Sequence, residues 1–229
     1  MESAQRYAIV QARIRATLAA AGRPDAPVTL IAVSKTQPAA KVRELYHLGQ
    51  RDFGENYLRE LEQKAAELAD LTALRWHFIG HLQSNKLKSV ARLAAAVHAL
   101  ADERHARILA REVEAIGTAP LSVYLAVNAG GEEGKSGVAP AAVTDLARMI
   151  VAECPALDVR GIMCIPPSSY SDPDTGLIVV PPLYLELAAL AKTVGRGELS
   201  LGMSGDLGLA LHAGATAVRI GTALFGARG

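Results

Sequence analysis

The chain has 229 residues, 50% of them hydrophobic, and its 24 Lys and Arg against 23 Asp and Glu give a formal net charge of +1. This balance and an aromatic content of 4% argue against a protein that binds nucleic acid by neutralising phosphates or stacking bases. Two cysteines, Cys154 and Cys164, make no disulfide framework and fit the reducing cytoplasm. The N-terminal segment does not resemble a signal peptide, and no apolar run approaches the roughly 20 residues that span a bilayer. We therefore expect a cytoplasmic protein with a single domain over residues 1–229, away from the membrane.

An amphipathic helix is predicted first, over residues 3–21, where apolar residues recur at helical spacing. A continuous apolar run then predicts a buried parallel strand over 28–33. The alternation that follows is helix 38–49, strand 52–54, helix 57–71, strand 75–79, helix 86–93, strand 95–99, helix 102–116, strand 121–127, helix 140–153, strand 159–165, helix 183–194, strand 199–203, helix 207–213 and strand 217–220. Residues 168–182 are predicted to form a long loop, with Pro182 in the first turn of the next helix.

Strict alternation of strands and helices implies right-handed crossovers and a parallel sheet. Eight such units in one domain favour a closed (β/α)8 TIM barrel over an open, doubly wound sheet. The extra N-terminal helix is expected to pack where a helix after the eighth strand would otherwise lie. The fold class is therefore α/β, a single TIM barrel with an additional N-terminal helix.

Polar residues and glycines follow nearly every predicted strand, at the barrel mouth where ligands bind. The segments concerned are Ser34-Lys35-Thr36, Gly54-Glu55-Asn56-Tyr57, Gly80-His81-Leu82-Gln83, Asn128, Pro166-Pro167, Met203-Ser204-Gly205-Asp206 and Arg219-Ile220-Gly221-Thr222. This concentration of polar residue types predicts a ligand site at the carboxyl ends of the strands.

The loops after strands seven and eight have the residues that a phosphate group requires. Ser204 with Gly205 and Thr222 with Gly221 combine hydroxyl donors with glycines that let backbone N–H groups approach closely. Each loop alone could consist of ordinary turn residues. Two such loops side by side in a barrel favour a phosphate site, which these folds commonly build at this place.

Lys35 is the candidate for covalent chemistry because it ends an apolar strand at the same mouth. A lysine shielded from water loses its proton more readily, and the neutral amine attacks an aldehyde to form a Schiff base. The alternative is a lysine at a strand end whose amine simply reaches solvent. An amine together with a phosphate site predicts a ligand that has both an aldehyde and a phosphate, and pyridoxal 5′-phosphate meets both demands.

Three other patterns resemble functional motifs only in part. Residues 129–136 nearly match a nucleotide-binding loop but begin with Ala129 in place of glycine, so an exposed loop is the preferred interpretation. His77 and His81 are four residues apart on a strand that enters a turn, so they do not share a helix face and zinc is not expected. A Gly-Met-Ser-Gly run resembles a nucleophile elbow, but Asp206 stands where the last glycine belongs.

Several segments, in the same order, resemble a known family over almost the whole chain. They are AVSKT (32–36), FGENY (53–57), WHFIGHLQSNK (76–86), KSG (135–137), RGIMCIP (160–166), LGMSGDL (201–207) and VRIGTALFGAR (218–228). In these the chain resembles the pyridoxal phosphate homeostasis protein family, a stand-alone barrel related to the N-terminal domain of alanine racemase.

The resemblance implies a role for each of a small set of residues. Lys35 would hold pyridoxal phosphate as a Schiff base, with Asn56 and His81 near the pyridoxal ring, Met203, Ser204, Gly221 and Thr222 at the phosphate end, and Arg219 at the pyridine nitrogen. Lys135 matches a family lysine associated with uptake or release of the cofactor. Two departures concern the local geometry after strands six and seven: Gly208 stands where family members often have glutamate, and residues 176–182 do not resemble the usual charged start of a helix.

A PLP-binding protein that buffers or delivers its cofactor is favoured over an amino-acid racemase-like enzyme, the main alternative. Racemisation requires an acid or base on each face of the cofactor adduct, and Lys35 supplies one. In the related racemases the second comes from another domain, whereas this chain ends at Gly229. We therefore expect a monomer without substantial catalysis, with apo-enzymes that depend on PLP as its recipients. A third class, weaker than these, is a barrel that binds another phosphorylated metabolite without a covalent bond.

Overall fold

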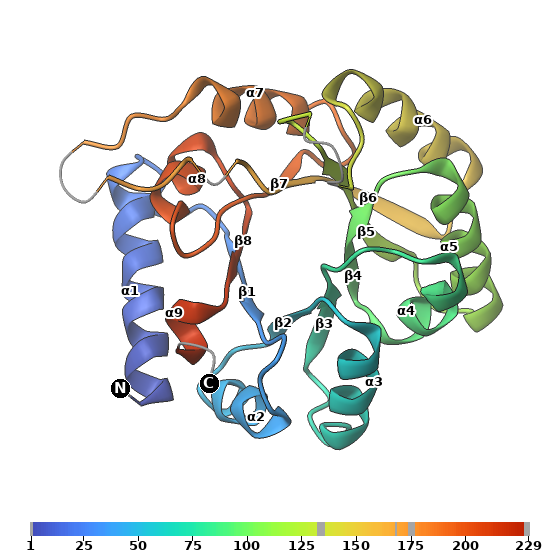
Figure 1. Cartoon of the computed structure of the whole chain (residues 1–229), viewed down its shortest axis with the longest axis horizontal. Helices are drawn as coiled ribbons and strands as arrows, with labels where there is room; N and C mark the ends of the chain where they lie inside the picture. The colour runs from blue at the N-terminus through green and yellow to red at the C-terminus, as the bar shows by residue number, and fades with distance from the viewer. Residues whose placement is uncertain (1, 132–135, 168, 174–176, 227–229) are drawn as a thin grey trace.

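The computed structural model describes residues 2–131, 136–167, 169–173 and 177–226. It confirms the predicted TIM barrel: eight parallel strands pair in sequence order, and β8 closes the sheet by pairing with β1 (Figure 1). The strands are β1 (Thr29–Val33), β2 (Asp52–Glu55), β3 (Arg75–Phe78), β4 (Ala96–Leu100), β5 (Leu121–Val127), β6 (Leu157–Cys164), β7 (Glu198–Ser200) and β8 (Ala217–Ile220). The predicted strands and these strands therefore correspond one to one.

Helices surround the barrel on its outside (Figure 1). They are α1 (Ser3–Ala20), α2 (Ala39–His47), α3 (Leu58–Glu67), α4 (Leu87–Leu93), α5 (Glu103–Ile116), α6 (Val143–Glu153), α7 (Pro182–Ala191), α8 (Leu207–Ala213) and α9 (Thr222–Phe225), with short 3-10 turns at Ser84–Lys86 and Pro140–Ala142. Local chemistry sets their ends. In α5, for example, the Asp102 carboxylate accepts the N–H of His105 at the first turn, and Gly117 adopts the left-handed conformation that ends the helix.

The N-terminal helix α1 packs where we expected it, between the last helices and α2. Its buried residues Val10, Ile14 and Leu18 face the core, and it lies beside α8 and α9 (Figure 1). Arg6 Nη1 donates to the carbonyl oxygen of Phe225 at 3.0 Å, and Arg23 Nη1 donates to that of Leu211 at 2.7 Å. Helix α1 therefore fixes the segments on either side of β8.

Strand seven differs from its prediction. The strand was expected over residues 199–203, but β7 ends at Ser200. Gly202 has a φ of +100°, which extended strands do not contain, and a Cβ there would lie 2.6 Å from the Cβ of Ala210. The strand therefore ends three residues earlier than its apolar pattern suggests, and Met203 lies in the loop. The predicted first-turn position of Pro182 in α7 is confirmed.

The interior of the barrel is unusually polar for this fold. His77, His98, Ser200 and Arg219 are buried there, whereas barrel interiors are commonly filled with Val, Ile and Leu. A small apolar cluster (Ala96, Tyr124, Ala126, Met163) is separate from the main core.

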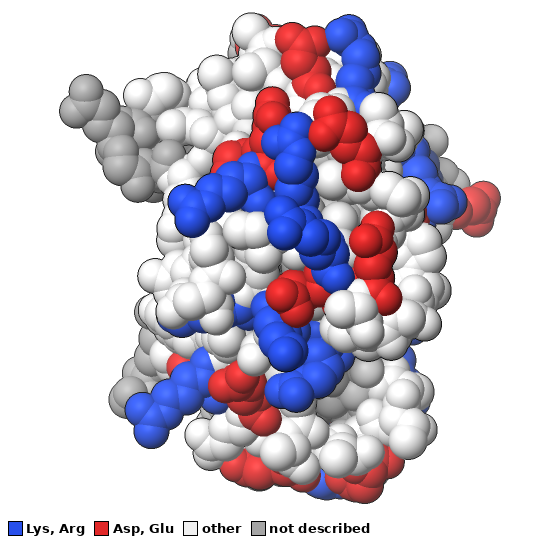
Figure 2. Space-filling view, turned by 90° about the vertical axis from the view of Figure 1, so that its right-hand side faces the viewer, with Lys and Arg blue, Asp and Glu red and all other residues white. Residues whose placement is uncertain are grey.

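The face on the right-hand side of Figure 1 has basic and acidic side chains intermingled, without one large region of either sign (Figure 2). Exposed ion pairs are part of this mixture: Arg107 of α5, for example, pairs with Glu103 and with Glu153. Within the described ranges, no helix is long and apolar enough to cross a membrane.

Candidate functional site

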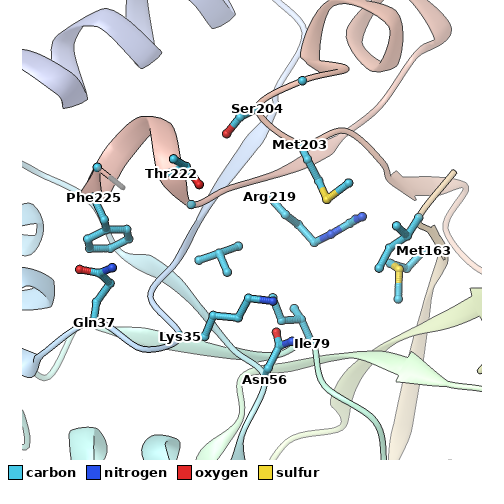
Figure 3. A pocket seen from close by; sticks show the side chains of 15 residues that line it. Lys35, Gln37, Asn56, Ile79, Met163, Met203, Ser204, Arg219, Thr222 and Phe225 are labelled. Carbon is cyan, nitrogen blue, oxygen red and sulfur yellow. The ribbon is translucent and has the colours of Figure 1, made fainter. Parts of the chain in front are cut away.

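A cavity of about 310 Å3 opens at the carboxyl ends of the strands (Figure 3). Its volume is at the low end of the range of roughly 300–1,000 Å3 that is typical of small-molecule sites. Its lining comes from segments far apart in the sequence: Val33, Lys35, Gln37, Asn56, Ile79, Met163, Ile165, Met203, Ser204, Gly205, Arg219, Gly221, Thr222, Phe225 and Gly226. The structure therefore brings together Lys35, Asn56, Met203, Ser204, Arg219, Gly221 and Thr222. Of the predicted site residues, only His81 does not line this cavity.

Lys35 lies in a tight turn directly after β1. The N–H of Gln37 donates to the carbonyl oxygen of Ser34 at 3.0 Å, which closes a four-residue turn with Lys35 at its second position. Thr36, at the third position, has a φ of +64°, in the left-handed region that a β-branched residue rarely adopts. The half-buried Lys35 side chain extends into the cavity (Figure 3). Strained backbone of this kind persists where surrounding contacts fix it.

A buried ion pair beneath the turn supplies those contacts. Lys64 of α3 donates to Glu55 Oε1 of β2 at 2.7 Å and to the carbonyl oxygen of Ser34 at 2.7 Å. It also donates to Glu60 Oε2 at 3.0 Å, and this same oxygen accepts the N–H of Thr36 at 2.7 Å. The Ser34 hydroxyl donates to Glu55 Oε1 at 2.7 Å. Lys64 therefore holds the residue before Lys35 directly, at the carbonyl oxygen of Ser34. It holds the strained Thr36 indirectly, through the carboxylate of Glu60.

Burial raises the pKa of Glu55, although the hydrogen bonds from Lys64 and Ser34 act in the opposite direction. Its second oxygen, Oε2, is buried and has no hydrogen-bond partner among the described residues. The carboxylate thus depends on Lys64 to remain charged.

This support for the turn was not predicted from the sequence. Lys64 has Leu61 three residues before it and Leu68 four residues after it, and all three are buried, so a charged residue occupies the core-facing stripe of the helix. That position was the signal that could have revealed it. Nothing in the spacing, however, named Glu55 as its partner.

The loops after β7 and β8 form the opposite wall of the cavity. Asp206 Oδ1 accepts the N–H of Met203 at 2.7 Å, and Asp206 Oδ2 accepts the hydroxyl of Tyr184 at 2.7 Å, which together fix the first loop. After β8, Thr222 begins the short helix α9, which the sequence analysis did not predict. Barrel phosphate sites are frequently made from these loops and a short extra helix, because N–H groups at a helix start have no intrahelical acceptor.

The departure at Gly208 is explained by the long loop that precedes α7. A Cβ at position 208 would lie 2.5 Å from Ile178 Cδ1 and 2.9 Å from Asp172 Oδ2. Asp172 accepts the N–H groups of Gly208 and Leu209, at 2.7 and 2.9 Å. Because glycine has no Cβ, this loop can pack against the start of α8. The departure at residues 176–182 lies partly outside the described residues, but its described part shares this contact through Ile178.

The same loop is tied to the cavity wall through α1. Arg13 Nη2 forms an ion pair with Asp172 Oδ2 at 2.7 Å, and its Nη1 donates to the carbonyl oxygen of Ser204 at 3.1 Å. One arginine therefore links the first helix, the loop before α7 and a predicted phosphate-binding residue.

Arg219 of β8 lines the cavity from the inside of the barrel. Its Nη1 donates to the carbonyl oxygen and the Oγ of Ser200, both at 2.8 Å, and its Nη2 donates to the carbonyl oxygen of Cys164 at 2.9 Å. Burial lowers the pKa of Arg219 to about 10, which leaves it a cation at neutral pH. Three of its five N–H groups thus donate to described protein acceptors, and the other two have no protein acceptor among the described residues.

His81 lies at a neighbouring cavity of about 190 Å3, which shares Ile79, Met163 and Ile165 with the first. Its Nδ1 is 2.8 Å from Ser136 Oγ. The predicted Lys135 lies outside the described residues. No cluster of three His, Cys, Asp or Glu side chains suited to a metal ion occurs in the described part of the chain.

Comparisons with known proteins identify the family. Residues 8–229 match the family model described as alanine racemase, N-terminal domain. A relative from Pseudomonas aeruginosa named pyridoxal phosphate homeostasis protein is 48% identical over 98% of this chain and 95% of its own length. The chain belongs to the pyridoxal phosphate homeostasis protein family. A member from Escherichia coli with the same name is 41% identical, over 98% of this chain and 96% of its own.

Solved structures agree with this family. PipY of Synechococcus elongatus without PLP has a TM-score of 0.82 at 33% identity, covering 98% of this chain and 100% of PipY. The structure of PipY with PLP bound has a TM-score of 0.79 with the same identity and coverage. Alanine racemase of Corynebacterium glutamicum has a TM-score of 0.63 at 16% identity, covering 98% of this chain and 60% of the racemase, which shows a shared fold.

Proposed function

We propose that this protein binds pyridoxal 5′-phosphate in the cavity at the carboxyl ends of the strands and takes part in its homeostasis. The observation that supports this most strongly is the meeting of Lys35 with Ser204, Gly221 and Thr222 at one cavity. An amine and a phosphate-binding wall on opposite sides match a ligand with an aldehyde and a phosphate. The names of the relatives and the PLP bound to PipY point to the same ligand.

The residues present fit this ligand in their chemistry. Ser204 and Thr222 offer hydroxyl donors, and a Cβ added at Gly205 would meet no atom within 4 Å, so the backbone there is open to a phosphate. Arg219 offers N–H donors to a ring nitrogen, and Asn56, beside Lys35 in the cavity (Figure 3), is a further donor and acceptor. Each group of the ligand therefore has a matching group in the cavity.

When bound, the cofactor would supply an aldehyde as the group that the Lys35 amine holds covalently, with loss of water. The chain's own residues determine where that amine lies. The buried Lys64 holds the carbonyl oxygen of Ser34, and Glu60 holds the N–H of Thr36, so both neighbours of Lys35 are anchored. The backbone from which the Lys35 side chain extends into the cavity is thereby fixed.

We further propose that the protein holds and releases the cofactor without substantial catalysis. Among the described lining residues, Lys35 is the one with an amine, imidazole, carboxyl, thiol or phenol group. Racemisation needs two proton-transfer groups, one on each face of the cofactor adduct. His81 lines the neighbouring cavity and is held by Ser136. The recipients of the cofactor would be apo-enzymes that use PLP, and the proposed form is a cytoplasmic monomer.

The visible absorption spectrum of the purified protein, before and after borohydride reduction, tests the binding proposal. We expect a yellow band that reduction abolishes, with the modified peptide containing Lys35. Lys35→Ala should lose the band, whereas Lys41→Ala, which removes an exposed lysine paired with Glu44, should keep it. A colourless wild-type protein that takes up no added PLP would overturn the proposal.

The non-catalytic part is tested separately. The loaded protein is incubated with L-alanine and other L-amino acids, and formation of the D-enantiomers and of keto acids is followed. Turnover at about 1 s⁻¹ or faster, in the range of typical enzymes, would contradict a holding role. No turnover, with release of PLP to an apo-enzyme that becomes active, supports it.

A further inference from the structure

A chain of buried hydrogen bonds crosses the barrel interior from its far mouth to the candidate cofactor cavity. Asp52 Oδ1 lies 2.9 Å from His77 Nε2, His77 Nδ1 lies 2.9 Å from His98 Nε2, and His98 Nδ1 lies 3.0 Å from Ser200 Oγ. Ser200 Oγ accepts from Arg219 Nη1 at 2.8 Å. The four links connect β2, β3, β4, β7 and β8.

The far end of the chain is anionic and fixed. Arg75 donates to both carboxylate oxygens of Asp52, at 2.7 and 2.6 Å, from a side chain that is 57% exposed. Burial alone would raise the pKa of Asp52, but the hydrogen bonds from His77 and Arg75 outweigh it and hold the pKa at about 2. Asp52 therefore remains a carboxylate at the amino ends of the strands, beside a cavity of about 500 Å3.

The direction of every bond in the chain follows from its two ends. The Asp52 carboxylate only accepts, so His77 Nε2 has the proton there. Burial lowers the pKa of His98 well below its ordinary value, so His98 is neutral. All groups are satisfied when His98 Nε2–H donates to His77 Nδ1 and the Ser200 hydroxyl donates to His98 Nδ1. The bonds then all point from Arg219 to Asp52.

Packed side chains enclose the middle of this chain of hydrogen bonds. Tyr124 stacks on His98 with ring centroids 4.2 Å apart, and its hydroxyl donates to Glu198, which also pairs with Arg160. His98 and Ser200 are fully buried. Hydrogen bonds aligned in one direction polarise one another, and in a dry interior the electrostatic effect is stronger than in water.

We infer that Asp52, His77, His98 and Ser200 are positioning residues for Arg219, and that they transmit the negative charge of Asp52 to the guanidinium that faces the cavity. This inference rests on the proposed function, because a ring nitrogen is the group that Arg219 would meet there. Ser200 accepts both N–H groups of Arg219 Nη1, one at its carbonyl oxygen and one at Oγ, and thereby fixes the plane of the guanidinium. A change at the far mouth therefore alters how the cavity holds the cofactor's ring.

The first test uses the cofactor-free protein, so its result reports on the chain of hydrogen bonds whether or not the protein binds PLP. Nitrogen-15 NMR of labelled histidines should show the ring proton of both His77 and His98 on Nε2, with Nδ1 as the acceptor. Assignment uses His77→Gln and His98→Gln. A protonated Nδ1 on either histidine would overturn the proposed direction.

The second test measures PLP affinity and the absorption maximum of bound PLP. Asp52→Asn keeps an oxygen acceptor for His77 but removes the charge, and we expect roughly 2- to 30-fold weaker binding with a shifted maximum. Asp102→Asn is the matched control, because it neutralises another aspartate that contacts a histidine, His105, and asparagine is an equally good helix cap. It should change neither quantity. Equal effects of the two substitutions, or none from Asp52→Asn, would contradict the inference.

A double-mutant cycle separates transmission along the chain from a field through space. In a Ser200→Ala background the link is broken, so adding Asp52→Asn should change PLP affinity by less than twofold. Full additivity of the two substitutions would show that the chain does not transmit the effect. Where Ser200→Ala does not fold, Ser200→Cys takes its place, since a thiol is a weak donor and acceptor.

Discussion

Replacing Lys64 by methionine isolates the buried ion pair that holds the turn around Lys35. The substitution keeps an unbranched side chain of similar size and removes three hydrogen bonds, to Ser34, Glu55 and Glu60. The side chain of Lys64 is 6% exposed and that of Glu55 is fully buried, so water cannot replace the lost amine. Glu55 is then left with the Ser34 hydroxyl as its partner.

Breaking a buried pair by removing one member costs about 3–5 kcal/mol, because the remaining charge is uncompensated. Such a loss is a large part of a total stability of about 5–15 kcal/mol. For a chain of this size it corresponds to a fall of roughly 6–20 °C in Tm. Lys41→Met, which removes an exposed lysine from α2, should change the free energy of unfolding by no more than about 0.5 kcal/mol.

The assay is urea unfolding at two pH values. Burial raises the pKa of Glu55 above its ordinary value of 4.5, and loss of Lys64 raises it further. In the window between the unfolded and the folded pKa the native state binds the extra proton, so stability falls as the pH rises through that window. The loss caused by Lys64→Met should therefore be smaller at pH 5 than at pH 8, and smaller again in a Glu55→Gln background. A loss below about 1 kcal/mol at pH 8, or one independent of pH, would refute the reasoning.

Three further predictions concern other contacts. Gly208→Ala should lower the free energy of unfolding, measured in urea, by about 1–3 kcal/mol through overpacking. Adding Ile178→Val removes the Cδ1 atom 2.5 Å from the new Cβ and should recover part of this loss; no recovery would contradict the contact. The pKa of Asp52 is about 2 against an ordinary 3.8, so its carboxylate should add about 2 kcal/mol to the free energy of unfolding above pH 4, and this is lost as the pH falls toward 2. In urea unfolding, the stability of Asp52→Asn should therefore fall less steeply between pH 4 and pH 2 than that of the wild type; equal slopes would count against the paired carboxylate. Thr36 has a φ of +64°, so Thr36→Gly should relieve strain and raise the free energy of unfolding by up to about 1 kcal/mol. The same substitution should loosen the turn and weaken PLP binding measured by absorbance; a loss of stability would show that the threonine is not strained.

The fold could be predicted from the sequence because a parallel barrel buries its strands on both faces. Continuous apolar runs such as β5 therefore stand out between helical patterns, and their order determines the topology. Strand seven was misplaced because its apolar run continues past Gly202, where the left-handed backbone ends the strand. The helix α9 escaped prediction because four residues contain too little helical periodicity to detect.

The candidate site was predictable where it depends on residue type at a strand end. Lys35, Ser204 and Thr222 have the required chemistry in the sequence itself, and the structure brings them to one cavity. The polar interior was not predictable in this way. His98 and Ser200 are 102 residues apart, and only barrel closure shows that β4 and β7 face one another across the interior. The spacing of His77 and His81 argues against a zinc site, but it does not reveal that His77 lies between Asp52 and His98.

The charge arrangement around Arg219 also bears on why such a cavity would hold its cofactor without reacting. A guanidinium fixed by Ser200 and Cys164 remains a cation, and a cation beside a pyridine nitrogen opposes protonation of that nitrogen. An unprotonated ring is a weaker electron sink, so carbanion chemistry at an attached amino acid is less favourable. The aldehyde and phosphate contacts, in contrast, do not depend on the ring nitrogen's proton. Under the proposed function, hydrogen bonds that keep Arg219 oriented and cationic would favour binding over turnover, and Asp52 at the far mouth would contribute to that balance through its contact with His77.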